Sequence, residues 1–355
     1  MKIAPLMKEY ARHPEAIRAT LLHTGQHYDD IMSRVFFSDL EIREPDIDLA
    51  VGSGSHAVQT AKVMIGFEEA VLKLRPDLVV VVGDVNSTMA CTLVAAKLNI
   101  PVAHIEAGLR SFDRRMPEEI NRIITDSLAD LLFTTSEDAH TNLSREGVPD
   151  ERIFFVGNTM IDSLLSLRSR CDLAAAKAKF GLNEDPFAFV TLHRPSNVDE
   201  RPILAGICSA LGQIQEHVKL FWPLHPRTRK MIADYGLMGV LDQMKNLVVT
   251  EPLSYIDSVS LMASATIVLT DSGGIQEETT VLGIPCLTLR NNTERPVTVT
   301  EGTNELVGNS PGRIVASAME VLRTGGKKGR IPRMWDGKAA GRIVEVIVRG
   351  IPSKE

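Results

Sequence analysis

The stretch LTDSGGIQEE, residues 269–278, joins an apolar run to polar residues at helical spacing. Asp271 or Ser272 can cap a helix that runs from about Ile275, and the glycines beside them allow an anion to approach the backbone N–H groups at the positive end of that helix. A diphosphate fits such a place. Glu278 lies about one turn further along, where a carboxylate could accept hydrogen bonds from the two hydroxyls of an attached ribose. The alternative explanation is an ordinary strand-to-helix turn with a solvated acidic first turn.

Acidic residues form a second candidate group, because carboxylates gathered in one place can have different proton affinities, so that one acts as a base and another as an acid. The residues concerned are Asp84, Glu106, Glu118 and Glu119, with Arg110, Arg114, Arg115 and Arg122 close in sequence. Asp84 and Glu106 each end a strongly apolar run, where a surface charge is not needed, and this favours a functional role. Glu118 and Arg122 are four residues apart, a spacing that also permits an ordinary surface ion pair.

Other polar residues also follow apolar runs, and in open parallel sheets ligands bind beyond the carboxyl ends of the strands. Residues at such positions are Gln26, His27, Gly83, Asp84, His104, Glu106, Gly108, His193, Arg194, His225 and 271–274. His193 and His225 are equally compatible with a structural role at strand ends. Two such edges facing each other would make one cleft.

Composition limits the classes of protein to which the chain can belong. Its 355 residues, 44% hydrophobic and 24% charged, are ordinary for a globular protein of two domains. The net charge of −6 and the scattered Lys and Arg residues argue against a nucleic-acid partner. No apolar stretch reaches about 18 residues, and residues 1–15 lack the apolar run and cleavage site typical of a signal peptide, so we expect no membrane partner and a cytoplasmic location. The four Cys are far apart, which suggests neither a metal site nor disulfides.

The fold class follows from short apolar runs that alternate with amphipathic stretches. Continuous apolar runs are typical of strands covered on both faces, and helical segments between them imply parallel sheets. The expected strands lie in the ranges 17–25, 77–84, 101–108, 128–136, 152–158, 187–195, 218–225, 246–252, 265–274 and 284–290. We therefore expect an α/β protein with a first domain over residues 1–165 and a second over 166–339. A helix at about 340–355 could pack back on the first domain.

With these residues identified, the chain resembles the non-hydrolysing UDP-N-acetylglucosamine 2-epimerases over nearly its whole length. The blocks that carry the resemblance are TGQH at 24–27, GDVNST at 83–88, HIEAGLRS at 104–111, PEEINR at 117–122, GNTMID at 157–162, TLHRPSN at 191–197, LTDSGGIQEE at 269–278 and NTERP at 292–296. So many blocks in the same order make a chance match improbable.

The resemblance implies a GT-B-like architecture, in which two Rossmann-like domains with parallel sheets face each other across a cleft, as a homodimer. It implies interconversion of UDP-N-acetylglucosamine and UDP-N-acetylmannosamine for bacterial surface polysaccharides. The partner is then a UDP-sugar, and we expect no cofactor and no metal. Relatives begin with a strand and a Gly-Thr-Arg-Pro-Glu loop upstream of Lys2, so this first strand is missing from the first domain here and Met1 is expected to be a misplaced start.

Site residues follow from the resemblance position by position. The implied catalytic residues are Asp84, Glu106, Glu118 and His193. The implied substrate-binding residues are Lys2, Arg122, His225, Leu253, Ser258, Ser272, Gly273, Gly274, Glu278 and Arg295. Ser258 stands where relatives commonly carry a Phe near the uracil, which leaves the Leu253 backbone and Tyr255 to define the base pocket.

The implied reaction explains why acids and an anion site are both needed. The C2 hydrogen of the sugar is not next to a carbonyl, so its direct removal would leave an unstabilised carbanion. Departure of UDP from C1 makes that hydrogen acidic, gives a 2-acetamidoglucal, and allows UDP to add back with inversion at C2. The alternatives are a GT-B glycosyltransferase, a hydrolysing epimerase that discards UDP, and a weakened nucleotide-sugar binding protein.

Overall fold

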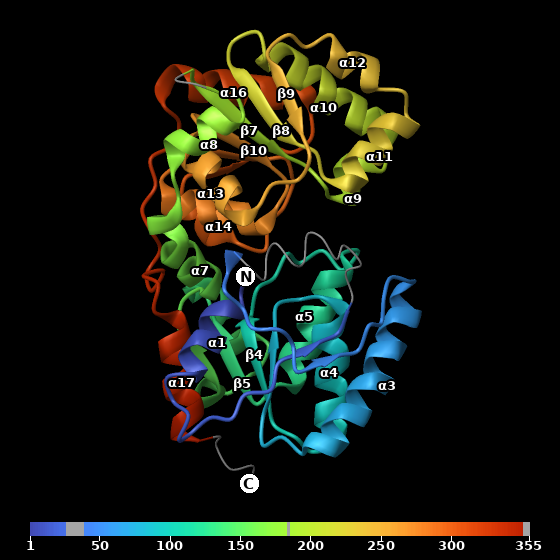
Figure 1. Ribbon diagram of the computed structural model, residues 1–355, viewed down its shortest axis with the longest axis vertical. Coiled ribbons are helices and arrows are strands. Elements are labelled where there is room, and N and C mark those ends of the chain that lie inside the picture. The colour runs from blue at the N-terminus through green and yellow to red at the C-terminus, as the bar shows by residue number, and fades with distance from the viewer. Residues whose placement is uncertain (26–38, 183–184, 351–355) are drawn as a thin grey trace. The chain divides into compact units, whose positions relative to one another are not determined.

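The computed structural model describes residues 1–25, 39–182 and 185–350, which form two compact units. Unit 1 contains Met1–Ser166 and Arg333–Glu355, and unit 2 contains Leu167–Pro332. The chain therefore leaves unit 1 once and returns to it near its C-terminal end (Figure 1). Gln26 and His27 lie outside the described residues.

Unit 1 is built on a parallel sheet with the strand order β3-β4-β5-β6. Its strands are β3 (Val79–Val82), β4 (Val102–Ala107), β5 (Leu131–Thr134) and β6 (Ile153–Phe155). β4 and β5 are buried along their whole length, as expected for parallel strands with helices on both faces. A separate two-stranded parallel sheet joins β1 (Leu22–His23) to β2 (Ile47–Asp48).

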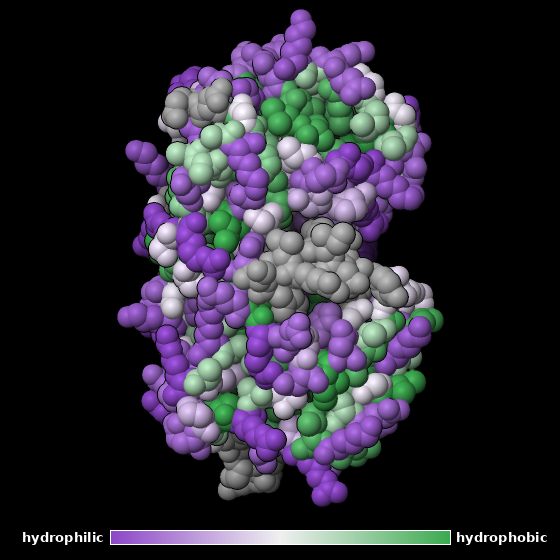
Figure 2. Space-filling view, viewed as in Figure 1, coloured by the Kyte–Doolittle hydropathy of each residue, from purple (hydrophilic) through white to green (hydrophobic). Residues whose placement is uncertain are grey.

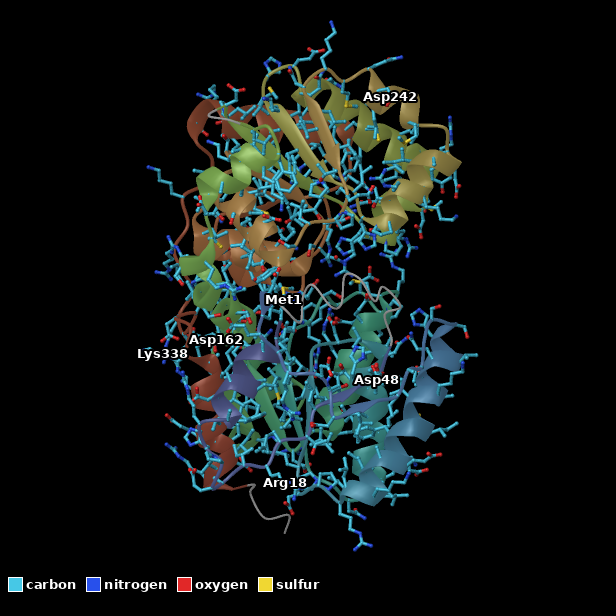
Figure 3. All side chains as sticks on the ribbon, in the orientation of Figure 1. Met1, Arg18, Asp48, Asp162, Asp242 and Lys338 are labelled. Carbon is cyan, nitrogen blue, oxygen red and sulfur yellow. The ribbon has the colours of Figure 1, made fainter. Side chains whose placement is uncertain are left out.

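The helices of unit 1 supply two apolar clusters around these strands. They are α1 (Ala4–Tyr10), α3 (His56–Leu74), α4 (Asn86–Lys97), α5 (Pro117–Leu128), α6 (Glu137–Arg145), α7 (Thr159–Leu167) and α17 (Ala339–Arg349), with the short helix η1 (Asp150–Arg152). α3 packs on α4, and α17 lies beside α1 although the two are at opposite ends of the sequence (Figure 1). Ile343 of α17 and Leu6 of α1 share one cluster with Phe133 of β5. The amide groups of Ala339 and Ala340 donate to Asp162, which anchors the start of α17 (Figure 3).

Unit 2 is built on a six-stranded parallel sheet whose order is β12-β11-β10-β7-β8-β9. Its strands are β7 (Phe187–Thr191), β8 (Lys219–Pro223), β9 (Leu247–Thr250), β10 (Ile267–Thr270), β11 (Cys286–Thr288) and β12 (Asn304–Leu306). Read from β9, the strands of this unit follow the Rossmann order, which reverses between its first strand, β7, and its fourth, β10. Loops after neighbouring strands diverge at such a switch point, so it is the expected ligand position.

Helices cover both faces of the unit 2 sheet. They are α8 (Leu173–Lys179), α9 (Pro195–Val198), α10 (Arg201–Ile214), α11 (Pro226–Asp234), α12 (Met238–Asp242), α13 (Tyr255–Ser264), α14 (Gly273–Leu282), α15 (Pro296–Thr300) and α16 (Pro311–Thr324), with the short helix η2 (Arg168–Arg170). α10 packs on α16, and their apolar residues join Trp222 and Leu269 in one core cluster. No helix within the described parts of either unit has the length and apolar character needed to cross a membrane.

The strands predicted from apolar runs are all present, and the predicted α/β class with parallel sheets is confirmed. Two further strands, β2 and β12, were not expected. Both are short, and each contains a charged residue, so neither shows the continuous apolar run by which the others are recognised.

Candidate active site

Glu106 lies at a bulge in β4. The register between β4 and β5 shifts between Ile105 and Ala107, and Glu106 has a φ of 70°, which residues with a side chain rarely adopt. Its carboxylate is buried and pairs with the ammonium group of Lys2 through Oε2. Among described residues, Oε1 has no hydrogen-bond partner. Strained backbone and a buried polar atom without a partner are both features that concentrate at functional sites.

Asp84 follows β3 at the same sheet edge. Its Oδ2 accepts hydrogen bonds from Nη2 of Arg122 at 2.7 Å and from Nε at 3.1 Å. Gly83, just before it, has a φ of 75°, and a Cβ atom there would lie 3.0 Å from Nζ of Lys2 and 3.5 Å from Oε2 of Glu106. Glycine therefore leaves room for the Lys2–Glu106 pair beside Asp84. The ends of β3 and β4 thus bring two of the predicted acids together, each with a basic partner.

α5 carries the remaining residues of this group. Arg122 is only 1% exposed, and its Nη1 also donates to Oε2 of Glu119 at 2.6 Å. Arg122 is therefore buried with Asp84 and Glu119 as partners, and does not lie on the surface. Glu119 also accepts hydrogen bonds from the backbone N–H groups of Ser111 and Phe112, so it organises the preceding loop. Glu118, the predicted acid, is half-buried on the first turn of α5.

His104 is completely buried behind this edge, although it was expected among the cleft residues. Nδ1 lies 2.6 Å from Oδ1 of Asp126 and Nε2 lies 2.8 Å from the carbonyl oxygen of Gly83. Arg110 donates to the other oxygen of Asp126 at 2.6 Å. Burial alone would raise the pKa of Asp126, but His104 and Arg110 outweigh burial and hold that pKa below its usual range. His104 therefore supports the turn that carries Asp84.

In unit 2, α14 begins at Gly273 rather than near Ile275. Ser272 occupies the N-cap position without a side-chain cap hydrogen bond. Asp271 does not cap the helix through the expected contact, because its carboxylate accepts from the backbone N–H groups of His193 at 3.0 Å and Arg194 at 2.9 Å. The Asp271 carboxylate, which follows β10, thus holds the loop after β7, and these two strands are neighbours in the sheet.

The two histidines lie beside each other after β7 and β8. Nδ1 of His193 is 3.1 Å from Oδ1 of Asp271, and the ring centroids of His193 and His225 are 5.4 Å apart. Burial would raise the pKa of Asp271, but hydrogen bonds from His193 and the nearby backbone lower it below its usual range. His225 also caps α11, since its Nδ1 accepts from the backbone N–H of Arg227 at 3.2 Å. His225 therefore has a structural contact as well as a place at this edge.

Arg295 lies against the start of α14. A Cβ atom on Gly273 would come within 2.6 Å of Nη1 of Arg295 and 2.7 Å of Oε1 of Glu294, so a larger residue there would displace these two buried side chains. Nε of Arg295 is 2.8 Å from Glu277, and Glu294 also pairs with Arg290 at 2.7 Å. These buried charges hold the Arg295 guanidinium beside a helix N-terminus, an arrangement suited to a phosphate anion.

α13 borders α14 at the position of Glu278. The Tyr255 hydroxyl donates to Oε1 of Glu278 at 2.6 Å, and both side chains are buried. Burial raises the pKa of Glu278 to about 7. Ser258 lies on the same helix as Tyr255, and Leu253 in the preceding loop; both are half-buried.

The predicted residues thus form two groups. In unit 1 the structure joins Lys2 to Glu106 and Arg122 to Asp84. In unit 2 it gathers the residues that follow β7, β8 and β10, together with Arg295 and Glu278. Sequence reasoning missed the roles of Glu277 and Glu294 and the Tyr255 contact. Glu277 lies inside the LTDSGGIQEE block and Glu294 inside the NTERP block, so both blocks held a signal. Within the described parts of the chain, no cluster of His, Cys, Asp or Glu is arranged to hold a metal ion.

The chain is similar to known proteins along nearly its whole length. A family model described as UDP-N-acetylglucosamine 2-epimerase matches residues 8–348. A UDP-N-acetylglucosamine 2-epimerase of Methanocaldococcus jannaschii is 40% identical, over 99% of this chain and 96% of the relative. A UDP-2,3-diacetamido-2,3-dideoxy-D-glucuronate 2-epimerase of Pseudomonas aeruginosa is 41% identical, over 94% of this chain and 92% of the relative.

Two solved structures of UDP-GlcNAc 2-epimerases have a fold similar to that of this chain. The crystal structure of the M. jannaschii UDP-GlcNAc 2-epimerase in complex with UDP-GlcNAc and UDP has a TM-score of 0.91 and 40% sequence identity, and covers 98% of this chain and 96% of that one. A structure of the Neisseria meningitidis UDP-GlcNAc 2-epimerase bound to UDP-GlcNAc has a TM-score of 0.90 at 32% identity and covers 98% of this chain and 96% of that chain. The predicted GT-B-like class is thereby confirmed.

Proposed function

The chain belongs to the UDP-N-acetylglucosamine 2-epimerase family, and we propose that it interconverts UDP-N-acetylglucosamine and UDP-N-acetylmannosamine by inverting C2. The observation that carries this proposal is the M. jannaschii structure, whose protein holds UDP-GlcNAc and UDP and matches this chain almost from end to end. The reaction needs an anion site for UDP and carboxylates for the proton at C2. The described residues offer candidates for both.

The proposed reaction has two balanced halves. The bond between C1 and the diphosphate oxygen breaks with its electron pair leaving on UDP, a carboxylate takes the C2 proton, and the C1–C2 double bond of a 2-acetamidoglucal forms. UDP then attacks C1 while a proton is added to the opposite face of C2. Only the configuration at C2 changes, provided that UDP is retained between the two halves.

Unit 2 is suited to hold the leaving UDP. The N-terminus of α14 at Ser272 and Gly273 presents backbone N–H groups to the diphosphate, and Arg295 adds a positive charge beside Gly273. His193, oriented by Asp271, stabilises the charge that develops on the leaving oxygen. Glu278 accepts hydrogen bonds from the ribose hydroxyls.

Unit 1 is suited to supply the proton chemistry. Asp84, Glu106 and Glu118 share the roles of base, acid and stabiliser of the charge at C1. Arg122 fixes the Asp84 carboxylate, and Lys2 fixes one oxygen of Glu106. The other Glu106 oxygen, which lacks a hydrogen-bond partner among described residues, is the atom best placed to meet a substrate proton.

Incubation with UDP-N-acetylglucosamine in heavy water tests this function. Deuterium should appear at C2 of both epimers, without net loss of UDP-sugar. Accumulation of free sugar and UDP would indicate a hydrolysing epimerase, and sugar transfer to an added acceptor would indicate a glycosyltransferase. Binding without exchange would indicate a nucleotide-sugar binding protein.

A second candidate substrate is UDP-2,3-diacetamido-2,3-dideoxy-D-glucuronate, because the P. aeruginosa relative that carries this name is as similar as the M. jannaschii one. Both substrates share the 2-acetamido group and the UDP leaving group, so the same chemistry applies. Parallel measurement of C2 exchange on each sugar decides between them: the higher kcat/KM identifies the physiological class.

We also infer a homodimer. α3 carries exposed apolar residues at helical spacing, Val58, Ile65 and Leu72, of which Ile65 is 61% exposed, and Figure 2 shows apolar surface over this part of unit 1. Exposed apolar surface of this kind is typical of protein interfaces. Sedimentation of the wild-type chain should give a dimer, and Ile65→Lys should shift it toward monomer; a monomeric wild-type chain contradicts the inference.

A cytoplasmic location is part of the same proposal. Cys91, Cys171, Cys208 and Cys286 are all free thiols, and free thiols persist in a reducing compartment. Fractionation of cells that produce the full-length protein with a C-terminal tag tests the location, and recovery from the membrane or secreted fraction would contradict it.

A further inference from the structure

Tyr255 is in direct contact with the acid proposed to bind ribose. Its hydroxyl donates to Oε1 of Glu278 at 2.6 Å, from α13 to the neighbouring α14. Tyr255 is 4% exposed and Glu278 is 3% exposed. Burial raises the pKa of the Tyr255 hydroxyl, so this group stays protonated and remains a hydrogen-bond donor.

Few other hydrogen bonds orient the Glu278 carboxylate. In the part of the chain that the structure describes, the Tyr255 hydroxyl is the only group that donates a hydrogen bond to the Glu278 carboxylate. The terminal torsion of a glutamate is intrinsically broad, so a carboxylate held at one oxygen is far better oriented than one held at neither. The second oxygen is then presented in a defined direction.

We propose that Tyr255 is a positioning residue for nucleotide recognition, which orients the Glu278 carboxylate so that it accepts hydrogen bonds from the ribose hydroxyls of a uridine diphosphate. This inference rests on the proposed function. The carboxylate binds the ribose, and the tyrosine acts through it. The ring of Tyr255 also packs in the core of unit 2, but only its hydroxyl has this role.

The test compares binding of UDP with binding of 2′-deoxy-UDP by calorimetry. The wild-type protein should bind UDP about tenfold more tightly, because the deoxy nucleotide lacks one donor to a charged acceptor. Tyr255→Phe keeps the ring and removes the donor. Its UDP to deoxy-UDP preference should fall to the value that Glu278→Gln gives, and the double variant should show no further loss.

Two substitutions separate positioning from packing. 4-Fluorophenylalanine at position 255 fills the volume of the hydroxyl but has no donor, so it should lower the preference for UDP as Tyr255→Phe does. It replaces Tyr255→Phe in the test if loss of the hydroxyl volume makes that variant unstable. 4-Aminophenylalanine at the same position restores a donor and should restore the preference for UDP. Tyr10→Phe is the matched control, because Tyr10 is also buried and its hydroxyl has no hydrogen-bond partner among described residues. This control should leave the preference unchanged.

The outcomes distinguish this inference from the function on which it rests. If the wild-type protein binds neither nucleotide, the proposed function fails. If it prefers UDP over deoxy-UDP and both donor-free variants keep the full preference, the role of Tyr255 is overturned while the function stands. A wild-type protein that binds both nucleotides equally would remove Glu278 from ribose recognition and overturn the inference too.

Discussion

Nδ1 of His193 lies 3.1 Å from Oδ1 of Asp271, so the imidazole after β7 is held by the carboxylate after β10. The two strands are neighbours in the sheet, with Thr191 in register with Thr270. Because Nδ1–H of His193 donates a hydrogen bond to Asp271, Nε2 is the ring nitrogen left to contact a ligand. This pair occupies the switch point of the unit 2 sheet.

Asp271→Asn should lower kcat because the amide cannot hold the His193 ring and tautomer as the carboxylate does. We expect a loss of about tenfold to a hundredfold, measured as initial rate of epimerisation. If Asp271 acts through the ring, Asp271→Asn combined with His193→Ala should be no slower than His193→Ala alone. Fully multiplicative losses would assign Asp271 a separate role.

Asp84→Asn, Glu106→Gln and Glu118→Gln should each lower turnover by about a hundredfold to ten-thousandfold, the usual range for loss of an acid or base. UDP should still bind, because its proposed contacts lie in unit 2. Calorimetry with UDP and a rate assay measure the two effects. Glu137→Gln is the control, since among the described residues the Glu137 side chain pairs only with Arg333, and both are exposed. Near-normal turnover in any of the three variants would remove that residue from the proposal.

Gly273→Ala should weaken UDP binding sharply. The added Cβ atom would meet Nη1 of Arg295 at 2.6 Å and Oε1 of Glu294 at 2.7 Å, so the buried charges must move. We expect a destabilisation of about 1–3 kcal/mol, the usual cost of an overpacked site, and a UDP Kd raised by about tenfold or more. Gly312→Ala on α16 is the matched control, because no described atom outside its own helix and its chain neighbours lies within 4 Å of its Cβ position. Equal melting temperatures and equal UDP affinities for the two variants would contradict this prediction.

UDP affinity should increase as pH rises through neutrality. Burial raises the pKa of Glu278 to about 7, so much of the acid is protonated below that pH in the free protein. Ribose hydroxyls are donors and bind best to the ionised carboxylate, so UDP binding favours the form present above the pKa. The ratio of the wild-type UDP affinity to the Glu278→Gln affinity should therefore increase from about pH 6 to about pH 8.5. Taking this ratio cancels the titration of UDP itself, and a flat ratio would show that Glu278 does not titrate in this interval.

Much of the fold could be predicted from local pattern alone. Val79–Val82 and Phe187–Thr191 read as strands because parallel strands covered on both faces need continuous apolar residues. The LTDSGGIQEE block was recognisable for a related reason, since Ser272 and Gly273 start a helix just after a strand that ends at Thr270. The contact of Asp271 with the backbone of His193 was not predictable, because His193 lies in the loop after β7, more than seventy residues earlier.

Sequence by itself determined the α/β class, the family and the short segments that carry polar residues, because these depend on residue type and spacing along one element. Only the tertiary structure showed that Glu119 and Glu277, one of each pair of adjacent glutamates, meet buried arginines. In contrast, Glu118 is half-buried and Glu278 meets Tyr255. Neighbouring residues on a helix point about 100° apart, so which of the two meets an arginine depends on how that helix is rotated against its sheet, which long-range packing sets.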